Sequence, residues 1–142
     1  MPNGIDLVRA DHERVRELFG RFNATLDDAL VGQTLGALKS HDDAERAALY
    51  ALAARVIDDP VLWDRLAAAH SATKKQIDVV STLRGSSLID AFQTLQAFVG
   101  DHVRVEETKL LPRLSEFATA EQLEGLAEQI LQVKNRVGLR TS

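Results

Sequence analysis

The chain has 142 residues, a net charge of -4 and no cysteine. The lack of cysteine excludes disulfides, thiolate metal sites and a cysteine nucleophile, so any metal site must use histidine and carboxylate ligands. The acidic balance, with no cluster of Lys and Arg, argues against a nucleic-acid-binding surface.

Hydrophobic residues make up 45% of the chain and aromatic residues only 5%, which favours packed helices over a β-sandwich. We therefore expect an all-α fold in one domain over residues 1–142. The four-helix bundle would cover about 5–114 and a C-terminal helix about 119–137. No stretch resembles a signal peptide or reaches the roughly 20 apolar residues of a membrane helix, so we expect a cytoplasmic protein without membrane contact.

The first predicted helix begins at Ile5 and ends in the middle or late twenties, with Asn3 or Asp6 as its cap. His12 lies within its apolar stripe, whose members recur three and four residues apart as on the inward face of a bundle helix. The stripe comprises Ile5, Val8, Val15, Phe19, Phe22 and Leu26.

The second predicted helix begins near Gly32 to Thr34 and continues to about Val56. His41 and Glu45 are four residues apart on its inward face, so both side chains reach a common point. Pro60 ends this helix, because proline lacks an amide donor and disfavours helical geometry in the preceding residue. Asp59 is a plausible cap for the next helix.

The third predicted helix runs from Val61 to about Leu83 and carries His70 on its apolar stripe. Gly85, Ser86 and Ser87 supply a C-terminal stop and an N-cap. The fourth helix then runs from Leu88 to about Leu111, where Pro112 loosens it. His102 and Glu106 repeat the four-residue spacing of the second helix.

A last amphipathic helix is predicted from about Thr119 to Arg136, with Thr119 and Gln122 as a capping box. It contains no histidine. It could lie across the bundle, cover the open end, or form a dimer contact. Its apolar side comprises Leu123, Leu126, Ile130, Val133 and Val137.

Short connections between long helices favour an up-down-up-down bundle. The four histidines of the chain fall on four different helices, each inside an apolar stripe. One such histidine is usually a buried neutral imidazole bonded to a backbone carbonyl or a hydroxyl. Four of them, together with two inward glutamates, need a common partner, because unpartnered buried polar groups cost roughly 1–3 kcal/mol each. A cation is the simplest partner.

Six nitrogen and oxygen ligands suit two oxophilic transition ions bridged by the two glutamates better than one Mg or Ca ion. Iron is the first choice, with manganese or zinc as alternatives. The predicted metal ligands are His12, His41, Glu45, His70, His102 and Glu106.

This order of ligands resembles the haemerythrin-like HHE cation-binding domain, as do the stretches VRADHERVRELF and HVRVEETKLLPRL around the first and last ligands. The resemblance covers about Ile5 to Leu114. It implies a four-helix bundle with a non-haem di-iron centre. The irons would have oxo or hydroxo bridging ligands and react with dioxygen, nitric oxide or peroxide.

The sequence departs from the oxygen-carrying members of that family at Lys74. Those proteins have a second histidine one turn after the third-helix histidine, where this chain has lysine. Their usual acidic residue before that histidine is also replaced, by Ala69. One fewer imidazole leaves a position for water, peroxide or another residue, which favours redox or catalase-like peroxide chemistry over reversible oxygen carriage.

Three further residues lie near the ligands in sequence. Tyr50 would point roughly 140° away from Glu45 on an ideal helix, so we expect it to pack or lie at the surface, unless a π-bulge turns it inward. Asp42 and Glu107 each adjoin a ligand but face about 100° aside, which predicts solvated side chains.

We therefore expect a protein that handles dioxygen, peroxide or nitric oxide in oxidative or nitrosative stress, as a monomer or homodimer, with no catalytic residue assigned. An alternative is a non-enzymatic iron or oxygen sensor, in which metal loading orders the bundle. A ferritin-like oxidase fits less well, because that class uses Glu-x-x-His pairs.

Overall fold

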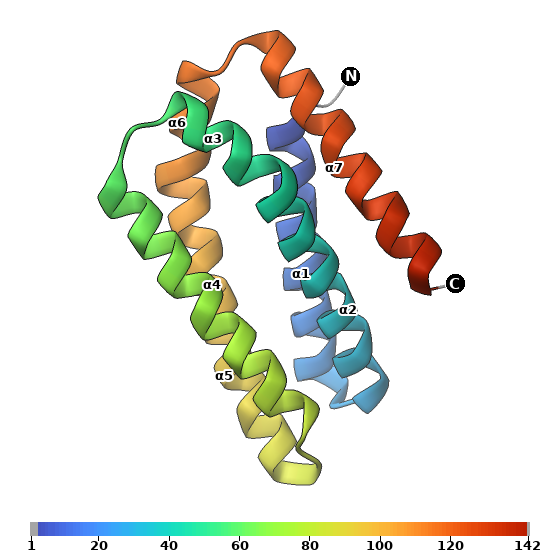
Figure 1. Cartoon of the computed structure of the whole chain (residues 1–142). Helices are drawn as coiled ribbons and strands as arrows, with labels where there is room; N and C mark the ends of the chain where they lie inside the picture. The colour runs from blue at the N-terminus through green and yellow to red at the C-terminus, as the bar shows by residue number, and fades with distance from the viewer. Residues whose placement is uncertain (1–2, 142) are drawn as a thin grey trace.

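The computed structural model describes the backbone of residues 3–141 and the side chains of residues 3–136. Val137, predicted on the apolar side of the last helix, lies outside the described side chains. The described chain is helical without strands, which confirms the all-α prediction. The helices form four bundle rods and a C-terminal helix (Figure 1).

Two of the bundle rods are single helices, α1 (Gly4–Thr25) and α4 (Pro60–Ser81). The other two are each interrupted by one π-helical segment. The second rod comprises α2 (Asp28–Ala44), η1 (Glu45–Leu49) and α3 (Tyr50–Val56). The fourth comprises α5 (Gly85–Val105), η2 (Glu106–Leu110) and α6 (Leu111–Phe117), and α7 spans Ala120–Thr141.

Side-chain caps fix the starts of several helices. Asn3 caps α1 and forms a capping box with Asp6. The second rod begins earlier than predicted, because Asp27 accepts a hydrogen bond from the Ala29 amide and caps α2 at Asp28. Asp59 caps α4, as predicted, by accepting from the Leu62 amide.

The fourth rod differs from its prediction at both ends. It begins at Gly85, whose φ of +65° is accessible to glycine, rather than after a serine cap. Pro112 does not loosen its end. The proline lies in the first turn of α6, where a missing amide proton costs nothing, and the helix continues to Phe117.

The four rods pair as two helical hairpins. α1 packs against the second rod through α2, and α4 packs against α5 in the fourth rod. α7 runs along the outer side of the first hairpin and contacts α1, α2 and η1 (Figure 1). The last helix therefore lies against the side of the bundle, which answers the question that its sequence left open.

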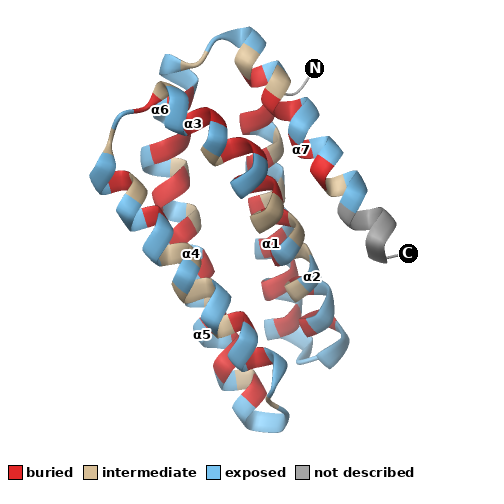
Figure 2. Ribbon diagram, in the orientation of Figure 1, coloured by how far each residue is buried: buried red, intermediate tan, exposed pale blue. Residues whose placement is uncertain are grey.

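The apolar core consists of two clusters, one towards the α3 and α6 end of the bundle and one towards the opposite end. On every rod of the bundle, one histidine lies between a residue of the first cluster and a residue of the second. On α1, for example, His12 lies between Val8 and Val15. The histidines therefore form a polar layer between two apolar clusters. Buried segments occur along every rod of the bundle (Figure 2).

Among the described residues, no helix combines the length and the apolar character that crossing a membrane requires.

Candidate metal centre

The six predicted ligands lie together between the two core clusters. Their donor atoms form two groups, in each of which the atoms lie within 4.8 Å of one another. The first group comprises His12, His41, Glu45 and Glu106, and the second comprises Glu45, His70, His102 and Glu106. Either group could hold a metal ion, and the two glutamates belong to both.

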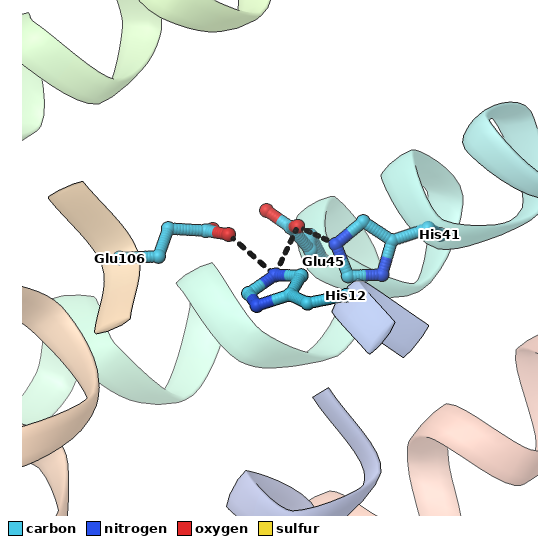
Figure 3. A group of neighbouring side chains, drawn as sticks. All are labelled: His12, His41, Glu45 and Glu106. Atoms are coloured by element: carbon cyan, nitrogen blue, oxygen red, sulfur yellow. Dashed lines mark hydrogen bonds and ion pairs between the residues drawn. The ribbon is translucent and has the colours of Figure 1, made fainter. Parts of the chain in front are cut away.

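The first group is formed mainly by the α1–α2 hairpin (Figure 3). His12 Nε2 lies 3.0 Å from Glu106 Oε1 and 4.0 Å from Glu45 Oε1. His41 Nε2 forms a close ion pair with Glu45 Oε1, and neither of these two buried atoms makes a hydrogen bond to any other group described. The side chains come from three rods and point towards one another.

The second group is formed mainly by the α4–α5 hairpin. His70 Nε2 lies 3.3 Å from Glu45 Oε2, and His102 Nε2 lies 3.4 Å from the same oxygen. His102 Nε2 is also 3.4 Å from Glu106 Oε2. The imidazole rings of His70 and His102 are in contact, with centroids 4.4 Å apart.

Each glutamate turns one carboxylate oxygen to each group. Glu45 directs Oε1 to His12 and His41 and Oε2 to His70 and His102. Glu106 directs Oε1 to His12 and Oε2 to His102. Both carboxylates are fully buried. This arrangement is the one that two bridging carboxylates require.

The two π-helical segments both begin at a glutamate of the site. In each, the amide five residues later donates to the glutamate carbonyl, Tyr50 to Glu45 and Leu111 to Glu106. The wider turn brings Tyr50 back over Glu45, whereas an α-helix would turn it away. The favoured expectation, that Tyr50 packs or lies at the surface, was therefore wrong, and the alternative, a π-bulge that turns it inward, is the one found.

The Tyr50 hydroxyl lies within the second group of donor atoms. It donates a hydrogen bond of 2.8 Å to Glu106 Oε2 and lies 2.5 Å from His70 Nε2. It is also 3.2 Å from His102 Nε2. The phenol thus contacts both imidazoles of the second group. His70 lies on α4, the helix that also carries Lys74, and His102 lies on α5.

Three carboxylates contact the outer nitrogens of the imidazoles. Asp11 Oδ2 lies 3.0 Å from His41 Nδ1, Asp42 Oδ1 lies 2.5 Å from His70 Nδ1, and Glu107 Oε1 lies 3.3 Å from His12 Nδ1. Such contacts fix the orientation and tautomer of a ligating imidazole.

Asp42 and Glu107 are partly exposed and lie outside both donor groups, as predicted, but their pairing with histidines was not predicted, and Asp11 was not singled out. Each of the three acids adjoins a ligand on its own helix and pairs with a histidine of a different helix. In a bundle, a side chain that lies about 100° around the helix from an inward position points at the neighbouring helix rather than only at solvent. The available sequence signal was that each of the three acids directly adjoins a predicted ligand, namely His12, His41 or Glu106.

α7 reaches this outer layer through Lys134, which sequence analysis also missed. Its ammonium group forms a close ion pair with Asp11 Oδ1, while the other oxygen of Asp11 contacts His41. Leu126 and Ile130 of α7 are buried in the core cluster that lies above the site. The C-terminal helix is thereby connected to one imidazole of the centre.

The carboxylates shift the pKa values of the imidazoles upward in the metal-free protein. Burial alone would lower the pKa of His12, but the hydrogen bond to Glu106 and the nearby carboxylate of Glu45 outweigh it and raise the value to about 9. For His41, burial is outweighed by the charge of Glu45 and the bond to Asp11, and the pKa rises to about 10. For His102, burial again lowers the pKa, but the nearby carboxylate of Glu106 outweighs burial and the pKa rises to about 10.

The carboxylate and phenol of the site shift in opposite directions. Burial would raise the pKa of Glu45, but the positive charge of His41 holds it well below its usual range. Burial and the negative charges of both glutamates raise the pKa of Tyr50. Without a metal, protons on the imidazoles balance the buried carboxylates, and a cation would take the place of those protons.

A cavity of about 330 Å³ adjoins the centre between the two hairpins. All four histidines and Glu45 line one end, and aliphatic side chains line much of the remainder. Lys74, at the position where oxygen carriers have a histidine, is exposed and lines this cavity without an ion pair among the described residues.

Together, a helical bundle and a buried layer of four imidazoles and two shared carboxylates define a cation-binding protein of the histidine–carboxylate class. The chain belongs to the hemerythrin HHE cation binding domain family, whose model matches residues 3–114. The resemblance seen in the sequence is thus confirmed. α7 lies outside the matched residues.

A curated protein from Nostoc sp., named DNA nickase, is 26% identical to this chain over 144 residues. The similarity covers 95% of this chain but only 40% of the length of that relative. No solved structure matches the chain.

Proposed function

We propose that the protein is a non-haem di-iron protein that binds or reacts with dioxygen, peroxide or nitric oxide. One observation carries the proposal: Glu45 and Glu106 each present one oxygen to each pair of imidazoles. Carboxylates shared in this way hold two ions side by side. Imidazole and carboxylate donors without thiolates suit iron, with manganese and zinc as the alternatives.

When bound, a pair of iron ions supplies the electron-transfer chemistry that small oxidants require. The protein's own residues would hold the ions and exclude bulk water. His12 and His41 would be terminal ligands of one ion, and His70 and His102 of the other. Asp11, Asp42 and Glu107 would orient three of these imidazoles through their outer nitrogens.

Two features favour reaction over reversible oxygen carriage. The lysine at position 74 leaves the second ion with fewer imidazoles than oxygen carriers have. The Tyr50 hydroxyl contacts His70, His102 and Glu106, so it would either contribute to that ion or hold a proton beside it. A phenol at that position is suited to hydrogen-bond a bound peroxide. We therefore favour catalase-like or other peroxide chemistry.

The alternative is a non-enzymatic iron or oxygen sensor, and the contact between Lys134 and Asp11 supports it. Through this ion pair, a change at His41 would reach α7 and the surface of the bundle. Hydrogen exchange of α7 distinguishes the alternatives. A sensor requires a large difference in exchange between metal-free and metal-loaded protein, whereas an enzyme requires turnover.

We do not extend DNA nicking from the curated relative to this chain. The chain corresponds to 40% of that protein, and its own net charge of -4 opposes binding to a polyanion. Conversion of supercoiled to open-circular plasmid by the iron-loaded protein would show this exclusion to be wrong.

Elemental analysis of protein purified from iron-supplemented cells tests the proposal, together with a near-ultraviolet spectrum for bridged ferric pairs. We expect two irons per chain. Anaerobic reduction, followed by separate exposure to oxygen, peroxide and nitric oxide, then identifies the reactant by absorbance. Gas evolution from peroxide indicates catalase-like turnover, and reversible spectra indicate binding or sensing. A folded protein that takes up no iron contradicts the proposal.

A further inference from the structure

The cavity beside the centre is much larger than the small oxidants considered above. Its volume of about 330 Å³ lies at the lower end of the range of about 300–1,000 Å³ for small-molecule sites. A water-sized molecule, such as hydrogen peroxide, occupies only about 30 Å³. The space therefore fits a molecule with an organic body.

The cavity walls are aliphatic. Five of the lining side chains are hydrocarbon, and they come from four different helices: Val15, Leu38, Ile77, Val99 and Val103. Aliphatic walls with a few polar groups are typical of sites that bind the hydrocarbon part of a small molecule. Apart from the predicted ligand Glu45, the charged side chains that line the cavity are three basic and three acidic, so their formal charges cancel: Lys39, Arg46, Lys74, Asp42, Asp43 and Asp78.

Apart from the predicted metal ligands, one polar group of the cavity-lining residues is buried without a partner. Thr73 Oγ1 is buried and makes no hydrogen bond with the described residues. Other helical hydroxyls in this protein donate to the carbonyl four residues earlier, namely Thr25, Thr34, Ser81, Thr94 and Thr108. Thr73 does not, so its buried hydroxyl has no partner to lose and would pair with a ligand after turning about χ1 into the cavity, one helical turn from His70.

We propose that this cavity binds the organic body of an uncharged hydroperoxide, ROOH, whose peroxide group meets the imidazole end and whose oxygen pairs with Thr73 Oγ1. This inference rests on the proposed function and names its substrate class. Reduction breaks the O–O bond, takes up two protons and two electrons, and gives an alcohol and water. A thiol reductant supplies the electrons and leaves as its disulfide.

Binding can be measured without turnover by loading the protein with zinc, which has no redox chemistry. Cumyl alcohol, the product of cumene hydroperoxide, is the probe, and isothermal calorimetry is the measurement. We expect one site per chain. Thr73→Val removes only the hydroxyl and should weaken binding roughly three- to tenfold, as expected for one hydrogen bond. Thr94→Val, at an exposed hydroxyl that bonds to Asp90, should leave binding unchanged.

Ile77→Phe fills part of the cavity and should abolish binding, with circular dichroism as the check on folding. If that variant does not fold, Thr73→Val still decides. With iron, kcat/KM for cumene hydroperoxide should exceed that for hydrogen peroxide, and Thr73→Val should lower the former more than the latter.

Zinc-loaded protein that binds no cumyl alcohol overturns the inference, as does binding that Thr73→Val leaves unchanged. Metal content is measured first in every sample. A protein that takes up two metal ions but no probe contradicts only this inference, whereas a protein that takes up no metal contradicts the proposed function.

Discussion

The phenol of Tyr50 donates a hydrogen bond to Glu106, although the two residues lie on different hairpins of the bundle. Tyr50→Phe removes a partner from a fully buried carboxylate, which should lower the free energy of unfolding of the metal-free protein by about 1–3 kcal/mol. If the phenol also contacts iron, the variant should lose a visible absorption band of the ferric protein while keeping its iron. Denaturant unfolding and absorbance measure the two effects. Unchanged stability would show that the hydrogen bond is not formed in solution.

The shared carboxylates predict an unequal effect of ligand substitutions on metal content. Glu45 contacts both groups, so Glu45→Gln should reduce iron uptake at both positions. His41 contacts only one group, so His41→Ala should leave about half of the iron. Glu128→Gln, at an exposed residue of α7, is the control. Equal iron loss in the Glu45 and His41 variants would contradict bridging.

The outer layer predicts graded effects on metal affinity. Asp11→Asn should weaken metal binding about 10- to 100-fold, because it removes the carboxylate partner of His41 Nδ1. Lys134→Met should have a smaller effect in the same direction, since Lys134 acts on His41 only through Asp11. Lys75→Met, at an exposed lysine, is the matched control. Competition with a chelator measures all three, and a Lys134 variant equal to the control would exclude a role for this ion pair.

The raised imidazole pKa values predict how the stability of the metal-free protein depends on pH. An imidazole whose pKa is higher in the folded than in the unfolded state stabilises the fold fully below the unfolded value of about 6.5. This contribution is lost as the pH rises through the folded values, about 9 for His12 and about 10 for His41 and His102. Thermal melts should show the metal-free protein losing stability between pH 7 and 10.

The metal-loaded protein provides the comparison for these melts. Its imidazoles are already deprotonated by coordination, so its melting temperature should change less over the same range. Parallel curves for the two forms would mean that the imidazoles are not protonated in the metal-free site.

The contact between α1 and α7 predicts a steric effect at Gly4. A Cβ atom at this position would lie 2.3 Å from Leu126 Cγ, so Gly4→Ala should displace α7 and cost about 1–3 kcal/mol. Gly36→Ala is the control, and its expected effect on stability has the opposite sign. Nothing lies within 4 Å of a Cβ there, and the substitution within α2 should stabilise by about 0.5–1 kcal/mol. Denaturant midpoints compare them, and a stabilising Gly4→Ala would contradict the close docking of α7.

The parts of the site that follow helical periodicity could be predicted from the sequence. His12 and His70 lie in stripes of apolar residues with a regular spacing, and that spacing alone places them inside the bundle. The pairs with a four-residue spacing, such as His102 and Glu106, could be read in the same way. The predicted starts of α2 and α5 were less accurate, because caps depend on local backbone geometry.

Tyr50 could not be placed because nothing in the residue types marks a π-helical turn. The five residues after Glu45 would form an ordinary α-helix by propensity, and the wider turn is visible only in the hydrogen-bond pattern. The pairing of Asp42 and Glu107 with histidines was missed for a different reason. A helix considered alone has one inward face, but a helix in a bundle also faces its neighbours, and both acids point in that direction.

The sharing of Glu45 and Glu106 has a mechanical consequence. Each hairpin supplies two imidazoles and one carboxylate, and each carboxylate also contacts the imidazoles of the other hairpin. Two bound ions would therefore cross-link the halves of the chain at mid-height, where the apolar core is interrupted. Metal loading would then determine how rigidly the hairpins are held together, and with it the width of the cavity between them.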